Sequence, residues 1–161
     1  MKKITILLAA ALIAGSFSGC KKASQSEGWM GPNKYRMVVV GAWDRERYYI
    51  EGQPAVEGKE PKSAIMLRQD AKTAAKLVAM RNFKEKMGAQ IKSKTGVEDG
   101  KLIGDVIQSA LEGITVSPGA FKEEYTDMND AMITYDFEAE GLQKVVDEMA
   151  SSALKKKNEG M

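Results

Sequence analysis

No histidine occurs in the 161 residues of this chain, and Cys20 is its only cysteine. Without histidine, imidazole-based nucleophile pairs and histidine-containing zinc sites are excluded. A single cysteine also excludes a disulfide within the chain. The carboxylates and lysines show no acid–base constellation in the sequence. We therefore expect a non-enzymatic protein with no metal and no cofactor.

Long hydrophobic runs are also lacking, apart from Ile4 to Ala14, which is too short to span a bilayer. Two lysines precede this run and small residues follow it, so residues 1–19 are predicted to be a signal peptide. The segment Phe17-Ser18-Gly19-Cys20 resembles the lipobox of bacterial lipoprotein signals. That resemblance implies cleavage between Gly19 and Cys20 and attachment of acyl chains such as palmitate to Cys20. An ordinary signal peptide that ends near a cysteine is the alternative.

No excess of charge remains after that cleavage, because the 24 basic residues less two signal lysines balance the 22 acidic ones. We therefore expect no nucleic-acid partner. Lys21 and Lys22 follow the cysteine where inner-membrane lipoproteins commonly carry aspartate. By resemblance to that pattern, the protein is expected at the outer membrane, lipid-anchored, with its domain periplasmic or surface-exposed.

The remaining sequence predicts a lipidated cysteine and flexible tether over residues 20–34, a single α+β domain over 35–155 and a polar tail over 156–161. We expect a small antiparallel three-stranded sheet covered on one face by helices, in the order β-α-α-β-β-α. The expected elements are a strand over Tyr35 to Trp43, a loop over Glu51 to Lys62, helices over Ser63 to Lys92 and Lys101 to Glu112 (closed by Gly113), strands over Phe121 to Thr126 and Ala131 to Ala139, and a final helix after Gly141. Turns are expected at Ser117-Pro118-Gly119 and Asp127 to Asp130.

Two of these segments carry a clear apolar pattern. In the last strand Ile133, Tyr135, Phe137 and Ala139 alternate with Met132, Thr134, Asp136 and Glu138, which predicts one buried and one wet face. In the long helix the apolar stripe Leu67, Ala71, Ala74, Ala75 and Val78 gives way to Met80, Phe83, Met87 and Ile91 on another side. Either this helix bends or its end packs against a different neighbour.

Several of these features together resemble the twenty-kilodalton outer-membrane lipoprotein family, which includes small flagellum-associated lipoproteins. The features are the lipobox, Val39-Val40-Gly41-Ala42, the helix with Arg68, Ala71, Ala75, Ala79 and Arg81-Asn82-Phe83, and the strand with Ile133-Thr134-Tyr135. The resemblance covers Tyr35 to Met149 and implies an outer-membrane lipoprotein. The insert Asp44 to Lys62 departs from the family pattern, and no catalytic residues are implied.

Surface contacts with a partner are predicted in and beside this insert. The candidate residues are Trp43, Arg45, Arg47, Tyr48 and Tyr49, with the loop Glu51 to Lys62. The two arginines could instead bind a carboxylate or phosphate, or form surface ion pairs. Lys155 to Lys157 could touch anionic headgroups, although the favoured reading is stabilisation of a helix C-terminus.

Calcium-loop spacing occurs once, at Asp127, Asn129 and Glu138, but Ala131 and Met132 replace a ligand and the glycine that such a loop needs. The favoured function is a non-enzymatic structural or adaptor component of the cell envelope, with an association with the flagellum as a narrower form of this expectation. Its partners would be the membrane, through the N-terminal lipid, and an envelope protein or a second copy of the chain. The alternative is a periplasmic ligand-binding or carrier lipoprotein with an apolar pocket between the long helix and the sheet.

Overall fold

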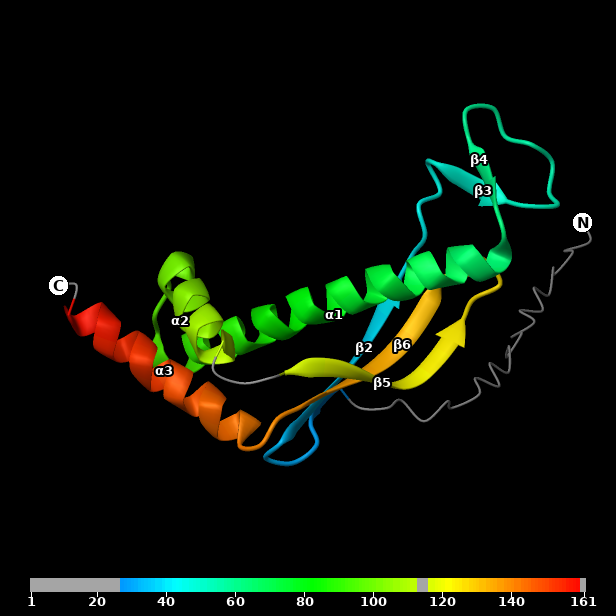
Figure 1. Ribbon diagram of the computed structural model, residues 1–161. Coiled ribbons are helices and arrows are strands. Elements are labelled where there is room, and N and C mark those ends of the chain that lie inside the picture. Colours follow the sequence, from blue (N-terminus) through cyan, green and yellow to red (C-terminus); the bar gives the residue numbers. More distant parts are fainter. Residues whose placement is uncertain (1–26, 113–115, 160–161) are drawn as a thin grey trace, which may run out of the picture.

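The computed structural model describes residues 27–112 and 116–159, and these form a mixed α/β fold with three helices (Figure 1). In chain order the elements are β1 (Gly28–Trp29), β2 (Lys34–Gly41), β3 (Tyr48–Ile50), β4 (Glu60–Lys62), α1 (Ala64–Thr95), α2 (Gly100–Glu112), β5 (Ser117–Tyr125), β6 (Ala131–Glu138) and α3 (Leu142–Glu159). The larger elements follow one another as β2-α1-α2-β5-β6-α3, as predicted, but the full order differs in detail because β1, β3 and β4 are added. Gly113 lies outside the described residues.

The main sheet has four antiparallel strands in the order β1-β2-β6-β5, so the prediction of three strands was wrong in detail. The additional strand, β1, is only two residues long and pairs Gly28 with Arg36 and Trp29 with Tyr35. Such a short strand has no readable period, and it places ordered backbone inside the segment predicted as tether. A second sheet pairs β3 with β4 in parallel, within the segment predicted as a loop.

The predicted turn at Ser117-Pro118-Gly119 was also wrong, because these residues begin β5. Proline is tolerated there because β5 is an edge strand, where one side of the backbone needs no donor. The register of β5 against β6 shifts between Ala120 and Lys122, which marks a bulge. The turn before β6 is confirmed, with Asn129 at a φ of 62°.

Helix α1 begins after Ser63, whose hydroxyl accepts a hydrogen bond from the Met66 N–H, and ends at Gly96 with a φ of 63°. Its fully buried positions recur every four residues: Leu67, Ala71, Ala75, Ala79, Phe83, Met87 and Ile91. Because four residues exceed one turn by about 40°, this row winds around the helix. The row therefore faces the sheet as far as Phe83, which stacks on Phe137, and faces other helices only toward the C-terminal end of α1. This matches the interpretation in which the end of the helix packs against a different neighbour.

Helices α2 and α3 gather around the C-terminal half of α1, while α1 alone lies along the sheet (Figure 1). Gly88 of α1 admits α2 closely, since a Cβ there would lie 3.5 Å from Ile103 Cγ2. Helix α3 continues through the lysines to Glu159, so most of the predicted polar tail is helical. No helix of the described ranges is both long and apolar enough to cross a membrane.

The sheet face turned away from α1 is less exposed to solvent than the alternation predicted, because Thr134 and Asp136 are buried. Arg36 clamps Asp136 with two hydrogen bonds, Nε to Oδ1 at 2.7 Å and Nη2 to Oδ2 at 2.8 Å. The hydrogen bonds from Arg36 hold the pKa of the Asp136 carboxyl below its usual value, against the opposing effect of burial. The Arg36 guanidinium also lies 3.9 Å from the ring centroid of Phe121. A buried charge is thus tolerated because it is paired and hydrogen-bonded.

Candidate partner-contact surface

Residues 44–62, predicted as an insert, form a small ribbon that projects beyond the N-terminal end of α1 (Figure 1). Strands β3 and β4 are held by their parallel ladder and by flanking bonds from Glu60 N–H to Arg47 C=O and from Glu51 N–H to Lys62 C=O, both 3.0 Å. At the start of the ribbon, Asp44 Oδ1 accepts from the N–H groups of Glu46 and Arg47. The segment is therefore ordered by its own backbone bonding.

Two of the predicted contact residues fasten this ribbon to the body. Trp43 is only 8% exposed, and its Nε1 donates to the Met128 carbonyl at 2.7 Å. Arg45 pairs with Asp130 in the same turn between β5 and β6. Across the turn, Arg68 of α1 donates to Asn129 Oδ1 at 2.9 Å. Trp43 and Arg45 thus hold the base of the ribbon, and the larger part of Trp43 is not available to a partner.

The other three predicted residues lie on the ribbon itself. Arg47 is exposed, and its guanidinium lies 5.1 Å from the ring centroid of Tyr48. Lys62 Nζ lies 4.3 Å from the same ring and pairs with Asp70 of α1. Tyr48 and Tyr49 are half-buried. The Tyr48 ring is therefore held in place by two cations, and both tyrosines retain some free surface, as aromatic side chains at protein interfaces often do.

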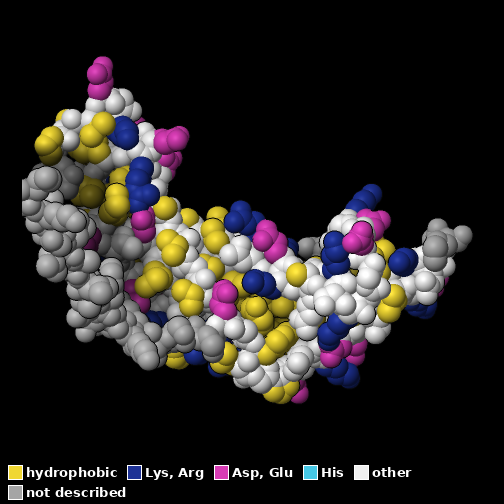
Figure 2. All heavy atoms as spheres, turned by 180° about the vertical axis from the view of Figure 1, so that it is seen from behind, with side chains coloured by type: hydrophobic (Ala, Val, Ile, Leu, Met, Phe, Trp, Pro, Cys, Tyr) yellow, Lys and Arg dark blue, Asp and Glu magenta, His cyan; other side chains and the backbone are white. Residues whose placement is uncertain are grey.

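Four exposed apolar side chains lie at this end, and of these only Val56 falls within the segment predicted to contact a partner. Ile65 and Met66 lie in the first turn of α1, Val56 in the ribbon and Met128 in the turn that Trp43 contacts; their exposed fractions are 74%, 54%, 44% and 58%. The projecting ribbon carries hydrophobic side chains beside basic and acidic ones (Figure 2, upper left). We call Arg47, Tyr49, Val56, Ile65, Met66 and Met128 the ribbon-end surface. The sequence held one sign of this surface: Ile65 and Met66 are apolar but do not belong to the apolar stripe of the long helix.

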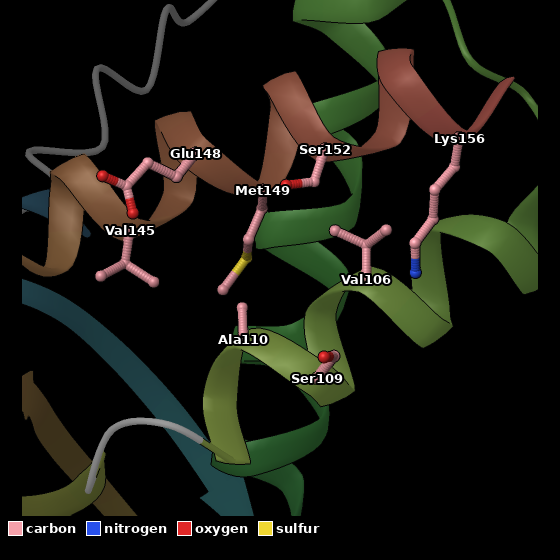
Figure 3. Close-up of a pocket in the computed structure, with 8 residues that line it drawn as sticks. All are labelled: Val106, Ser109, Ala110, Val145, Glu148, Met149, Ser152 and Lys156. Carbon is pink, nitrogen blue, oxygen red and sulfur yellow. The ribbon is translucent and has the colours of Figure 1, made fainter. Parts of the chain in front are cut away.

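A groove lies at the opposite end of the molecule, between α2 and α3, with a volume of about 430 Å³. Val106 and Ala110 of α2 point toward Met149 of α3, and Lys156 extends from α3 toward α2 (Figure 3). Glu148 lies at the other side of the groove, and its Oε1 is 3.6 Å from Lys144 Nζ. This groove is not where an apolar pocket was expected, since fully buried core side chains such as Phe83 and Phe137 fill the contact between α1 and the sheet.

The other predicted sites are the lipidation site at Cys20 and the calcium-like spacing. Gly19 and Cys20 lie outside the described residues, so the signal cleavage and the lipid remain predictions. Within residues 27–112 and 116–159, no cluster of three or more acidic side chains could hold a metal ion. Asn129 of the calcium-like spacing instead accepts a hydrogen bond from Arg68.

Comparison with known proteins found no matching family model, no matching curated protein and no matching solved structure.

Proposed function

We propose that this protein is a lipid-anchored, non-enzymatic adaptor or structural component of the bacterial outer membrane. The observation that carries the proposal is the lipobox-like segment Phe17-Ser18-Gly19-Cys20, which ends a signal-like sequence with the only cysteine of the chain. Membership of the twenty-kilodalton lipoprotein family, and a flagellar association, are finer forms of the same proposal. They rest on the sequence resemblance alone.

The distance between anchor and domain supports a role at the membrane surface. Only seven residues separate Cys20 from Gly28, where β1 begins. Even when fully extended, that stretch spans at most about 28 Å. A domain on so short a connection stays beside its membrane, where it can hold an envelope partner in place.

The ribbon-end surface is the proposed contact for that partner. It combines exposed apolar side chains with Arg47 and a half-buried tyrosine. These residues lie on the ribbon, whose backbone is ordered by the ladder between β3 and β4, and on the adjoining first turn of α1 and the turn before β6. Met and arginine are enriched in protein interfaces, and an ordered surface loses little entropy on binding. The partner is an envelope protein or a second copy of the chain.

Loss of the anchor provides the first test. In bacterial cells Cys20→Ala is expected to move the protein from the detergent-rich to the aqueous phase of a detergent partition, because the thiol is the only attachment point for acyl chains. Ser24→Ala, in the adjoining segment, is the matched control and should remain detergent-bound. If Cys20→Ala still enters the detergent phase, the lipoprotein assignment is wrong. Fractionation of the wild type into the inner membrane would contradict the proposed location.

Loss of the ribbon tip tests the adaptor role. Replacing Gln53 to Glu57 by a Gly/Ser segment of equal length should preserve the melting temperature, because these side chains are all exposed. Lys59 is retained because its Nζ donates to the Arg45 carbonyl at 2.5 Å. Recovery of crosslinked partners from intact cells, measured by mass spectrometry, should fall.

The control for this experiment is Leu77→Ser, which changes another exposed apolar residue, 68% exposed, in the middle of α1. Its partner recovery should equal that of the wild type. Equal recovery from the ribbon variant as well would refute the proposed contact surface. The alternative function, a ligand-binding or carrier lipoprotein, would use the groove between α2 and α3, and filling that groove with Ala110→Phe would be the corresponding variant.

A further inference from the structure

The outer edge of β2 is paired along only part of its length. Strand β6 pairs with all of β2, from Lys34 to Gly41, whereas β1 on the other side reaches only Tyr35 and Arg36. The segment Met37 to Gly41 therefore has a strand neighbour on one side alone, as far as the structure describes the chain.

The direction of the free backbone groups follows from two hydrogen bonds at the start of β2. The Asn33 carbonyl accepts from Ala139 N–H on the β6 side, and the Lys34 carbonyl accepts from Met30 N–H on the β1 side. Because backbone groups alternate between the two sides of a strand, those of Val38 and Val40 face away from β6. No residue of the described ranges bonds to them. The edge thus presents two N–H donors and two C=O acceptors.

The opposite edge of the sheet is protected in ways that this one is not. On β5, Pro118 lacks an N–H, a bulge interrupts the register after Ala120, and Glu123 adds charge. These are the devices by which proteins prevent edge strands from pairing with other chains. The segment Met37 to Gly41 contains no charge, no proline and no bulge, and Val40 is 57% exposed.

Within the described residues, β1 does not continue along this edge. The ladder between β1 and β2 stops at Gly28, whose φ of 137° is rare for other residues. Glu27, the residue before it, belongs to no strand. No described segment of the chain therefore pairs with Val38 and Val40, and their outward backbone groups are left for another strand.

We propose that this edge pairs with the same edge of a second copy, antiparallel, about a two-fold axis at Val39. In that register Val38 faces Val40 of the second copy, and Val40 faces Val38, so all four outward groups of each chain are paired. Centring the axis on Val38 would instead place Val40 against Arg36, which β1 already occupies. The register is thus set by the length of edge that β1 leaves free.

The contact is also compatible with two identical chains. No like charges meet, because the paired segment is uncharged. Lys72 of α1 pairs with Glu123 of β5, so by helical spacing Ala74 and Val78 lie on the flank of α1 toward the free edge. Both are half-buried and short, which lets the α1 helices of two copies approach. The dimer would have one continuous sheet and an isologous interface.

Disulfide trapping tests the register. The background for this experiment is Cys20→Ser, which removes the only thiol of the chain. In this background Val38→Cys chains, mixed with Val40→Cys chains and oxidised, should give a crosslinked dimer. Residues directly opposite in such a pair are about 5.5 Å apart between Cα atoms, which suits a disulfide. Either variant alone should remain uncrosslinked, since its two cysteines would lie about 8 Å apart, beyond disulfide reach.

An independent test measures the molecular mass in solution. The sample is the chain from residue 20 onward, carrying the substitution Cys20→Ser. Light scattering should give twice the chain mass, and Val40→Lys or Val40→Pro should give the single mass while the circular-dichroism spectrum remains that of the folded chain. Val40→Thr, which keeps the branched side chain and the N–H, should remain dimeric. A monomer at all concentrations, a dimer that both edge variants retain, or crosslinks within a single variant would each overturn the proposal. None of these results depends on the lipid anchor.

Discussion

Replacing Gly41 by alanine is expected to destabilise the fold strongly. An alanine Cβ at this position would lie 2.2 Å from the Ala71 carbonyl oxygen and 2.2 Å from the Ala75 nitrogen of α1. Both are backbone atoms, so no side chain can rotate away, and β2 and α1 must separate. Because α1 and the sheet share most of the core, we expect a loss at or above the upper end of the roughly 1–3 kcal/mol typical of over-packing.

Thermal unfolding followed by circular dichroism measures this effect, with an expected fall in Tm of about 10 °C or more. The matched control is Gly104→Ala in α2, where a Cβ would meet nothing within 4 Å. That change should raise stability slightly, since alanine is preferred over glycine in a helix by about 1 kcal/mol. A Gly41→Ala protein as stable as the wild type would show that α1 does not cross β2 this closely.

Truncating Phe83 to alanine is expected to cost about 3–5 kcal/mol of unfolding free energy. Phe83 is completely buried, and its ring stacks on Phe137 with centroids 4.3 Å apart and an interplanar angle of 5°. Tyr35 meets the same ring edge-on at 5.9 Å. The substitution would therefore leave a cavity where α1, β2 and β6 meet.

Denaturant unfolding of three variants separates this cavity from a general effect of mutating α1. Phe83→Leu preserves most of the volume and should cost clearly less than Phe83→Ala. Leu77→Ala, at a position 68% exposed on the same helix, should change stability by no more than about 0.5 kcal/mol. Equal losses for Phe83→Ala and Leu77→Ala would contradict the packing described here.

Periodic segments were predictable because burial on one side leaves a mark in the sequence. The alternation of Ile133, Tyr135 and Phe137 identified β6, and all three are buried. The row in α1 was harder to interpret, because it winds around the helix and changes neighbours along its length. Helical propensity nevertheless predicted the helix to within three residues of its C-terminal end.

Features that depend on distant contacts were not predictable. Gly41 lies in the strand predicted from sequence, but only the structure shows that β2 pairs with β6 without interruption there and that the glycine serves the close approach of α1. Trp43 suggested a surface contact because it precedes a loop, yet its Nε1 bonds to a carbonyl 85 residues away in sequence. Strands β3 and β4, at three residues each, are too short to show a period.

At 32 residues, α1 is about 48 Å long, greater than the thickness of a bilayer with its headgroups. Phe83 touches Tyr35, which pairs with β1, so the attachment point of a chain anchored at Cys20 lies part-way along this helix. Roughly 29 Å of helix extends from there toward the ribbon and about 18 Å toward α2 and α3. With the proposed lipid anchor in place, the membrane attachment would lie near the middle of α1, so a tilt that brings one end of the helix toward the membrane would move the other end away.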